Sequence, residues 1–213
     1  MKKVAYVFFS LALIACGSQQ KTTQNTAENV SPSPTPPSPP TVIEVEQEAS
    51  IEEVVDKQLI EGEAMLENGM LVGEGNIEQL TKAPFNTWFE GRANAYTPEA
   101  DVLEQIAQNI NDYNLTLYMG TWCGDSKRET PKIYSLLEKT GYNMDNLTFY
   151  AVNRQKTIPG GLPQGSNVKR VPTLIFYKDG QEVNRFVEYP QETLAKDILK
   201  IVSGEDYKNS YAE

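Results

Sequence analysis

A short apolar run that leads directly into a Trp-Cys-Gly triplet is the feature that most narrows what this chain can fold into. Residues 115–119 (LTLYM) have the composition of a buried strand, and GTWCGDSKRETP follows at 120–131. Apolar residues at helical spacing then continue as far as Gly141, and glycine commonly ends helices. The sequence therefore predicts that Cys123 lies between the end of a strand and the start of a helix.

The elements on either side of this junction also alternate between helix and strand. Apolar spacing predicts helices over 98–113 and near 194–202, and strands at 147–152, 173–177 and 183–187. Asp179-Gly180 separates the last two strands, and this dipeptide favours a two-residue hairpin. The order predicts an α/β fold with a mixed central sheet and helices on both faces.

This order of elements resembles the thioredoxin superfamily, over roughly residues 98–204. WCGDS at 122–126 stands where that family places its redox cysteine, and Pro131 matches the proline of the family's active-site helix. Val-Pro-Thr at 171–173 precedes a strand as the family's cis-proline loop does, and PTLIFYKDGQEV resembles its strand-turn-strand segment. The resemblance implies a thioredoxin-like fold in which Cys123 is the redox residue.

The resemblance also implies a peptide-binding groove beside the sulfur. In the family, the backbone of the residue before the cis-proline pairs with a bound peptide. Carried over onto this sequence, the residues expected to bind substrate are Trp122, Gly124, Asp125, Val171, Pro172 and Thr173. The residues expected to be catalytic are Cys123 and Ser126.

Three positions depart from the family's pattern. Ser126 stands where a dithiol enzyme carries its second cysteine, and Leu117 stands where thioredoxin buries an aspartate. The stretch from Arg154 to Arg170, RQKTIPGGLPQGSNVKR, replaces a short helix and is rich in proline and glycine. We expect it to form an irregular loop beside the cis-proline and to help select partners.

A single thiol restricts the chemistry that this site can perform. A helix N-terminus stabilises a thiolate, and a thiolate attacks disulfides to form a mixed disulfide. Release of that intermediate needs another thiol, which Ser126 cannot supply, although its hydroxyl could donate a hydrogen bond to the sulfur. We therefore expect monothiol thiol–disulfide exchange, isomerase-like or completed by an external thiol, on thiols and disulfides of cell-envelope proteins.

The first residues have the pattern of an export signal. Two lysines precede the apolar run 4–15, which is too short to span a bilayer. Residues 13–16 (LIAC) resemble the lipobox of bacterial lipoproteins, whose cysteine carries the lipid. The sequence predicts a signal peptide at 1–15, a lipid on Cys16 and a disordered Pro-rich linker through 16–48. We expect the protein at the periplasmic face of the outer membrane.

Two further segments flank the predicted domain. Residues 49–97 form an N-terminal extension, in which apolar spacing over 50–72 predicts a helix. We expect the aromatic residues of this extension to dock on the domain, namely Phe85, Trp88, Phe89 and Tyr96. Residues 205–213 form a tail that we expect to be frayed.

Composition argues against several classes of function. The chain has 213 residues, a formal net charge of −10 and a pI near 4.7, so it is expected to repel nucleic acid. It contains no histidine, which removes Cys-His catalytic pairs and the commonest metal ligand. We expect no metal, no cofactor and no nucleic-acid partner.

Three alternatives to monothiol exchange stay open on the sequence. The thioredoxin-like groove could bind peptides or proteins without any redox turnover. Residues 123–126 are also similar to the C-G-F-S motif of monothiol glutaredoxins, which would imply glutathione or an iron–sulfur cluster. Lastly, Cys123 could be a small buried residue without chemistry.

Overall fold

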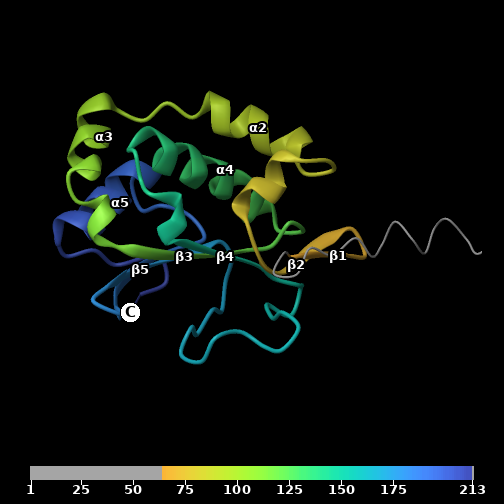
Figure 1. The fold of residues 1–213 in the computed structure, drawn as a ribbon. Coiled ribbons are helices and arrows are strands. Elements are labelled where there is room, and N and C mark those ends of the chain that lie inside the picture. Colours follow the sequence, from red (N-terminus) through yellow and green to blue (C-terminus); the bar gives the residue numbers. More distant parts are fainter. Residues whose placement is uncertain (1–63, 213) are drawn as a thin grey trace, which may run out of the picture. The chain divides into compact units, whose positions relative to one another are not determined.

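The structure is a computed structural model, and it describes residues 64–212. They belong to one unit whose centre is a mixed sheet of six strands in the order β1-β2-β4-β3-β5-β6 (Figure 1). In chain order the elements are β1 (Met65–Glu67), β2 (Met70–Gly75), α2 (Asn86–Ala95), α3 (Ala100–Ala107), β3 (Asn114–Met119), α4 (Gly124–Lys139), β4 (Leu147–Ala151), β5 (Thr173–Lys178), β6 (Gln181–Val187) and α5 (Leu194–Ser203).

Part of the predicted organisation lies outside the described residues. This applies to the signal peptide at 1–15, to Cys16, to the Pro-rich linker and to the first part of the N-terminal extension. Among residues 64–212, no helix is long and apolar enough to cross a membrane.

The strands around the predicted cysteine junction occupy the expected ranges. β3 pairs in parallel with β4, with Leu117 opposite Phe149, and antiparallel with β5. β5 and β6 form a hairpin through Asp179 and Gly180, whose φ angles of 52° and 76° are the positive values that this two-residue turn requires. The predicted α/β fold with a mixed central sheet is confirmed.

The helices of the described residues pack on one face of the sheet (Figure 1). Leu117, Phe149 and Leu174 contribute to this buried cluster from β3, β4 and β5. Ile133 and Ile198 contribute to the same cluster from α4 and α5. The prediction of helices on both faces is therefore wrong for this part of the chain.

The opposite face of the sheet is covered by the segment 154–170 (Figure 1). Ile158, Leu162 and Val168 from this segment pack against a second buried cluster on the sheet. Its central part contains two prolines and three glycines, and all three glycines have positive φ angles. These residues prevent a regular helix, so the predicted irregular loop is confirmed.

The predicted helix over residues 50–72 is wrong where the structure describes it. β1 and β2 form an antiparallel hairpin, and β2 pairs with β4 through Gly73 opposite Ala151. The turn consists of Asn68 and Gly69, with φ angles of 48° and 75°, and Asn-Gly strongly favours a two-residue hairpin. The preference of Asn68-Gly69 for a hairpin turn therefore determines the structure here, although the preceding apolar residues have helical spacing.

The aromatic residues of the N-terminal extension dock on the helical layer, as predicted. Phe85 and Phe89 are buried, and Trp88 and Tyr96 pack against the same cluster. Phe89 contacts the ring of Tyr134 on α4, with the ring centroids 5.4 Å apart. The extension thus contributes core side chains as well as two strands.

The C-terminal residues up to 212 are anchored to the domain by a buried tyrosine, so the prediction of a frayed tail is wrong for the residues that the structure describes. Tyr207 is buried, and its hydroxyl donates a hydrogen bond to Oδ2 of Asp197, 3.0 Å away. The buried carboxylate of Asp197 also accepts from the backbone N–H groups of Gln191 and Glu192. Burial and the adjacent carboxylate raise the pKa of Tyr207, which keeps the phenol protonated as a donor.

Candidate functional site

Cys123 caps the N-terminus of α4. Its backbone is extended, with φ −87° and ψ 130°, and Gly124 begins the helix. The thiol is partly exposed, and Sγ donates a hydrogen bond to the carbonyl oxygen of Val171 at 3.3 Å. Because Cys123 is the N-cap residue, the unpaired N–H groups of the first helical turn favour a negative charge at this end. The thiol thus lies between a helix N-terminus and the loop before β5.

The loop opposite the sulfur contains a cis peptide bond between Val171 and Pro172, as predicted. The N–H of Glu188 donates to the carbonyl oxygen of Pro172 at 2.8 Å. The hydroxyl of Thr173, which is buried at the start of β5, donates to the carbonyl oxygen of Arg170 at 2.8 Å. These two hydrogen bonds fix the backbone of the loop that faces the thiol.

Trp122 packs in the same buried cluster as Cys123. Its Nε1 donates to the carbonyl oxygen of Val152 at 2.8 Å, and the guanidinium carbon of Arg154 lies 5.4 Å from the ring centroid. The ring also lies against Gly120, where an added Cβ would come within 2.6 Å of Nε1. Glycine is therefore required at position 120 for the indole to occupy this position.

Ser126 is completely buried, and its hydroxyl forms a hydrogen bond with the backbone. Ser126 Oγ accepts a hydrogen bond from the N–H of Gly120 at 3.1 Å. Within the described part of the chain, no hydrogen bond joins Ser126 to Cys123. The expected O–H···S contact is therefore absent from this structure, and Ser126 ties the end of β3 to the first turn of α4.

The negative charge of Asp125 is offset by a neighbouring cation. Asp125 forms an ion pair with Arg128 at 2.6 Å, and Arg128 also contacts the buried carboxylate of Glu129 at 2.6 Å. Lys132 completes this network through Glu129 at 3.2 Å. Across residues 64–212, no group of three or more His, Cys, Asp or Glu side chains could hold a metal ion.

A contact between the loop 120–123, which carries the thiol, and the N-terminal hairpin was not foreseen from the sequence. Thr121 Oγ1 accepts a hydrogen bond from the N–H of Leu71 in β2 at 3.1 Å, and both residues are buried. The Asn68-Gly69 dipeptide was the sequence signal from which the hairpin itself could have been predicted. It predicts two strands, but it does not say which strand of the sheet they join.

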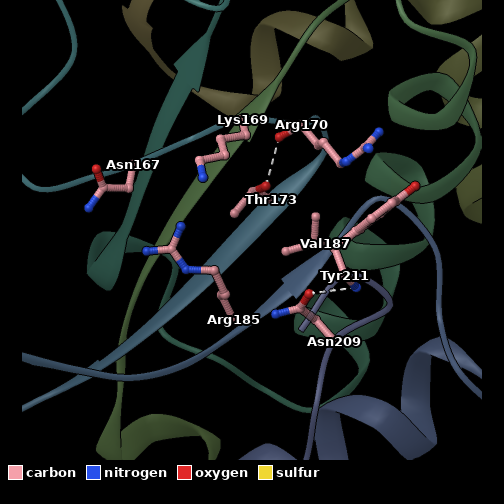
Figure 2. A pocket seen from close by; sticks show the side chains of 8 residues that line it. All are labelled: Asn167, Lys169, Arg170, Thr173, Arg185, Val187, Asn209 and Tyr211. Carbon is pink, nitrogen blue, oxygen red and sulfur yellow. Dashed lines mark hydrogen bonds between the residues drawn. The ribbon is translucent and has the colours of Figure 1, made fainter. Parts of the chain in front are cut away.

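A pocket of about 390 Å³ lies next to the cis-proline loop (Figure 2). It is lined by Asn167, Lys169, Arg170, Thr173, Arg185, Val187, Asn209 and Tyr211. Sequence reasoning missed this pocket because its lining comes from four separate parts of the chain: the segment 154–170, β5, β6 and the C-terminal residues.

The structure thus brings Trp122, Cys123 and Val171 together on a mixed sheet, with the thiol at a helix N-terminus and opposite a cis-proline. A fold and a site of this kind define a thioredoxin-like protein. Residues 96–200 match the Thioredoxin family model, which supports placing the chain in the thioredoxin superfamily. Thiol–disulfide redox chemistry is the function that this class suggests.

Curated relatives of the chain include thioredoxins. Thioredoxin-2 of Saccharomyces cerevisiae is 34% identical over 70 residues, which cover 33% of this chain and 62% of that protein. A thioredoxin-like protein of Acanthamoeba polyphaga mimivirus is 28% identical over 83 residues, which cover 39% of this chain and 58% of that protein. The chain therefore spans about three fifths of the length of these two relatives.

Among solved structures, the chain is similar to mitochondrial thioredoxin 3 of Saccharomyces cerevisiae in its oxidized form. The alignment covers 53% of this chain and 98% of that chain, at 17% identity and a TM-score of 0.32.

Proposed function

We propose that this protein performs thiol–disulfide exchange through a single thiol, Cys123, on protein substrates. The position of Sγ carries the proposal, because it is partly exposed, at the N-terminus of α4 and 3.3 Å from the carbonyl oxygen of Val171 beside a cis-proline. A peptide that pairs with the backbone of Val171 brings its own sulfur next to Sγ.

Each exchange step forms one S–S bond and breaks another. The thiolate of Cys123 attacks one sulfur of a substrate disulfide, and a mixed disulfide forms between Sγ and that sulfur. The other substrate sulfur leaves as a thiolate and takes a proton from solvent, so no net oxidation or reduction occurs. The dipole of α4 stabilises the attacking thiolate, and Arg128 offsets the nearby charge of Asp125.

Release of the mixed disulfide depends on a thiol from outside the site. Ser126 occupies the position where a dithiol enzyme carries its second sulfur. It is buried, and its hydroxyl accepts a hydrogen bond from the N–H of Gly120. The thiol released from the substrate can attack the intermediate and reshuffle the substrate's disulfides, which makes the activity isomerase-like. A small thiol or a thiol of another protein can also complete the cycle.

We further propose that the domain acts at the bacterial cell envelope, anchored by a lipid on Cys16. The apolar leader at 4–15 behind two lysines and the LIAC sequence at 13–16 support this proposal. Each buried lipid methylene contributes about 0.8 kcal/mol to membrane binding, so several acyl chains on one cysteine anchor a protein stably. The substrates are then envelope proteins that carry thiols or disulfides, and the outer membrane is the favoured location.

The activity is tested with a protein whose disulfides have been scrambled. In the presence of free substrate thiols, the wild-type chain should speed the recovery of native disulfides, because Cys123 attacks incorrect bonds and the substrate resolves the intermediate. Cys123→Ser should give no acceleration. A Cys123→Ser variant that accelerates recovery as well as wild type does would contradict the proposal and favour a redox-independent binding module.

A further inference from the structure

We infer that the pocket beside the cis-proline loop binds an acidic side chain of the substrate polypeptide, near the substrate cysteine that reacts with Cys123. The inference rests on the proposed function, since it names a substrate class for the same site. It is carried by the charge, the construction and the position of the pocket.

Two cationic groups face the same side of the pocket. Figure 2 shows the amine of Lys169 and the guanidinium of Arg185 turned toward the same space. Glu182, at 2.6 Å, and the carbonyl oxygen of Ser166, at 3.1 Å, hold Arg185 in place. Lys169 forms no ion pair with any residue between 64 and 212. Because Glu182 already pairs with Arg185, the uncompensated charge is that of Lys169, and a carboxylate placed beside its amine would gain charge-assisted hydrogen bonds.

The other side of the pocket is built from the C-terminal residues. The guanidinium carbon of Arg170 lies 3.8 Å from the ring centroid of Tyr211, and Arg170 pairs with Glu188 at 3.4 Å. Asn209 Oδ1 accepts from the N–H of Tyr211 at 3.0 Å, so its NH₂ group is available to a ligand (Figure 2). The packed C-terminus therefore completes a pocket whose walls are fixed by internal contacts.

The pocket adjoins the predicted peptide groove. Arg170 and Thr173 line it, and they flank Val171 and Pro172; the carbonyl oxygen of Val171 lies 3.3 Å from Sγ. An extended polypeptide advances about 3.3 Å per residue, and the pocket begins at Arg170 next to Val171, so an acidic side chain a few positions from the reacting cysteine is the kind of group that would reach it.

The distribution of charge along the chain would direct an acidic substrate toward the pocket. The formal net charge is −10, yet the segment 154–170 contains four cationic residues and no carboxylate. An acidic peptide is therefore repelled by the chain as a whole and attracted along this segment. Such a field orients an acidic substrate toward the thiol.

Binding is measured by fluorescence anisotropy on the full chain carrying Cys123→Ser, so that no covalent bond forms. One labelled peptide has an Asp-Glu pair about three residues from an S-methylated cysteine, on either side in turn, and its partner has Asn-Gln instead. Lys169→Glu should weaken binding of the acidic peptide about tenfold and leave the neutral peptide within about twofold. The matched control is Lys82→Glu, which makes the same charge change outside the pocket and should leave both peptides within about twofold.

Three results would overturn the inference. These are equal affinity for the acidic and neutral peptides, an equal loss with Lys82→Glu, and displacement of the acidic peptide by inorganic phosphate at equimolar concentration. The last result would mark a general small-anion site.

The failure of this inference is distinguishable from failure of the proposed function. Reaction of the wild-type thiol with a small uncharged disulfide depends on Cys123 alone. If that reaction occurs and the acidic preference is absent, the inference fails and the proposed function stands. If the preference is present and the thiol does not react, the pocket stands and the proposed function fails.

Discussion

Gly120 and Ser126 hold the junction between β3 and α4 on either side of the thiol. Ser126 Oγ accepts from the N–H of Gly120, and the indole of Trp122 lies against the same glycine. Both contacts are short and partly or wholly buried, so a change of one side-chain atom affects them directly. They explain how the chain keeps a thiol at a helix N-terminus with a serine at position 126.

Gly120→Ala should therefore destabilise the protein by about 1–3 kcal/mol. The added Cβ would lie 2.6 Å from Nε1 of Trp122, so the indole has to move away from the carbonyl oxygen of Val152. Urea unfolding followed by tryptophan emission measures the loss. Gly124→Ala is the matched control, because nothing lies within 4 Å of a Cβ added there, and it should be neutral or slightly stabilising. Equal destabilisation by both changes would argue against this role of Gly120.

At the scale of elements, the hairpin β1–β2 extends the sheet and reaches the loop 120–123. β2 pairs with β4, and the N–H of its Leu71 donates to Thr121, two residues before Cys123. The region matched by the family model begins at residue 96, so this contact comes from outside it. The extension is thus positioned to stabilise the loop that carries the thiol.

Thr121→Val should cost about 1–3 kcal/mol, because it leaves the buried N–H of Leu71 without its acceptor. Amide hydrogen exchange at Leu71 should become faster, which a general loss of packing at position 121 would not single out. The control is Thr87→Val, whose exposed hydroxyl bonds to the carbonyl oxygen of Pro84, and its effect should stay within about 0.5 kcal/mol. Unchanged exchange at Leu71 in the Thr121 variant would refute the proposed link.

The elements that could be predicted from the sequence are those set by local patterns. Asp179-Gly180 predicted a hairpin, and apolar spacing predicted the strand–helix junction at Cys123. The cis bond at Pro172 followed instead from the family resemblance. The hairpin at Asn68-Gly69 was missed because apolar residues before it repeat at helical spacing. The pairing of β2 with β4, the one-sided helical layer and the pocket depend on contacts between distant segments, which no local pattern encodes.

At the scale of the whole molecule, tyrosines that are buried in the core or pack against it link stability to pH. Burial raises the pKa of Tyr96 and of Tyr118 to about 12, whereas an unfolded tyrosine titrates near 10. The folded state therefore holds these protons more tightly, and this contribution to stability is lost as pH rises from about 10 toward 12. The free energy of unfolding, measured with urea, should fall over this range, and Tyr118→Phe should reduce the fall. A flat profile up to pH 12 would disagree with the burial of these rings.

The proposed lipid anchor concerns the whole chain, including its first residues. Full-length protein made in a bacterium that processes lipoproteins should fractionate with membranes, and Cys16→Ser should move it to the soluble fraction because the acceptor of the lipid is gone. Cys123→Ser is the matched control, since it removes a thiol without removing the anchor. A Cys16→Ser protein that still sediments with membranes would exclude anchoring through this residue.

Single-thiol exchange at Cys123 is tested most directly by the intact mass of the folded protein after reaction with an activated peptide disulfide near neutral pH, in a Cys16→Ser background. We predict one peptide adduct per molecule, on Cys123, that persists until a small thiol is added. Adding Ser126→Cys should remove the adduct without external thiol, because an attacking sulfur is then present. A folded protein that stays unmodified, or an adduct of the protein with Ser126 intact that is lost without any added thiol, would contradict the account.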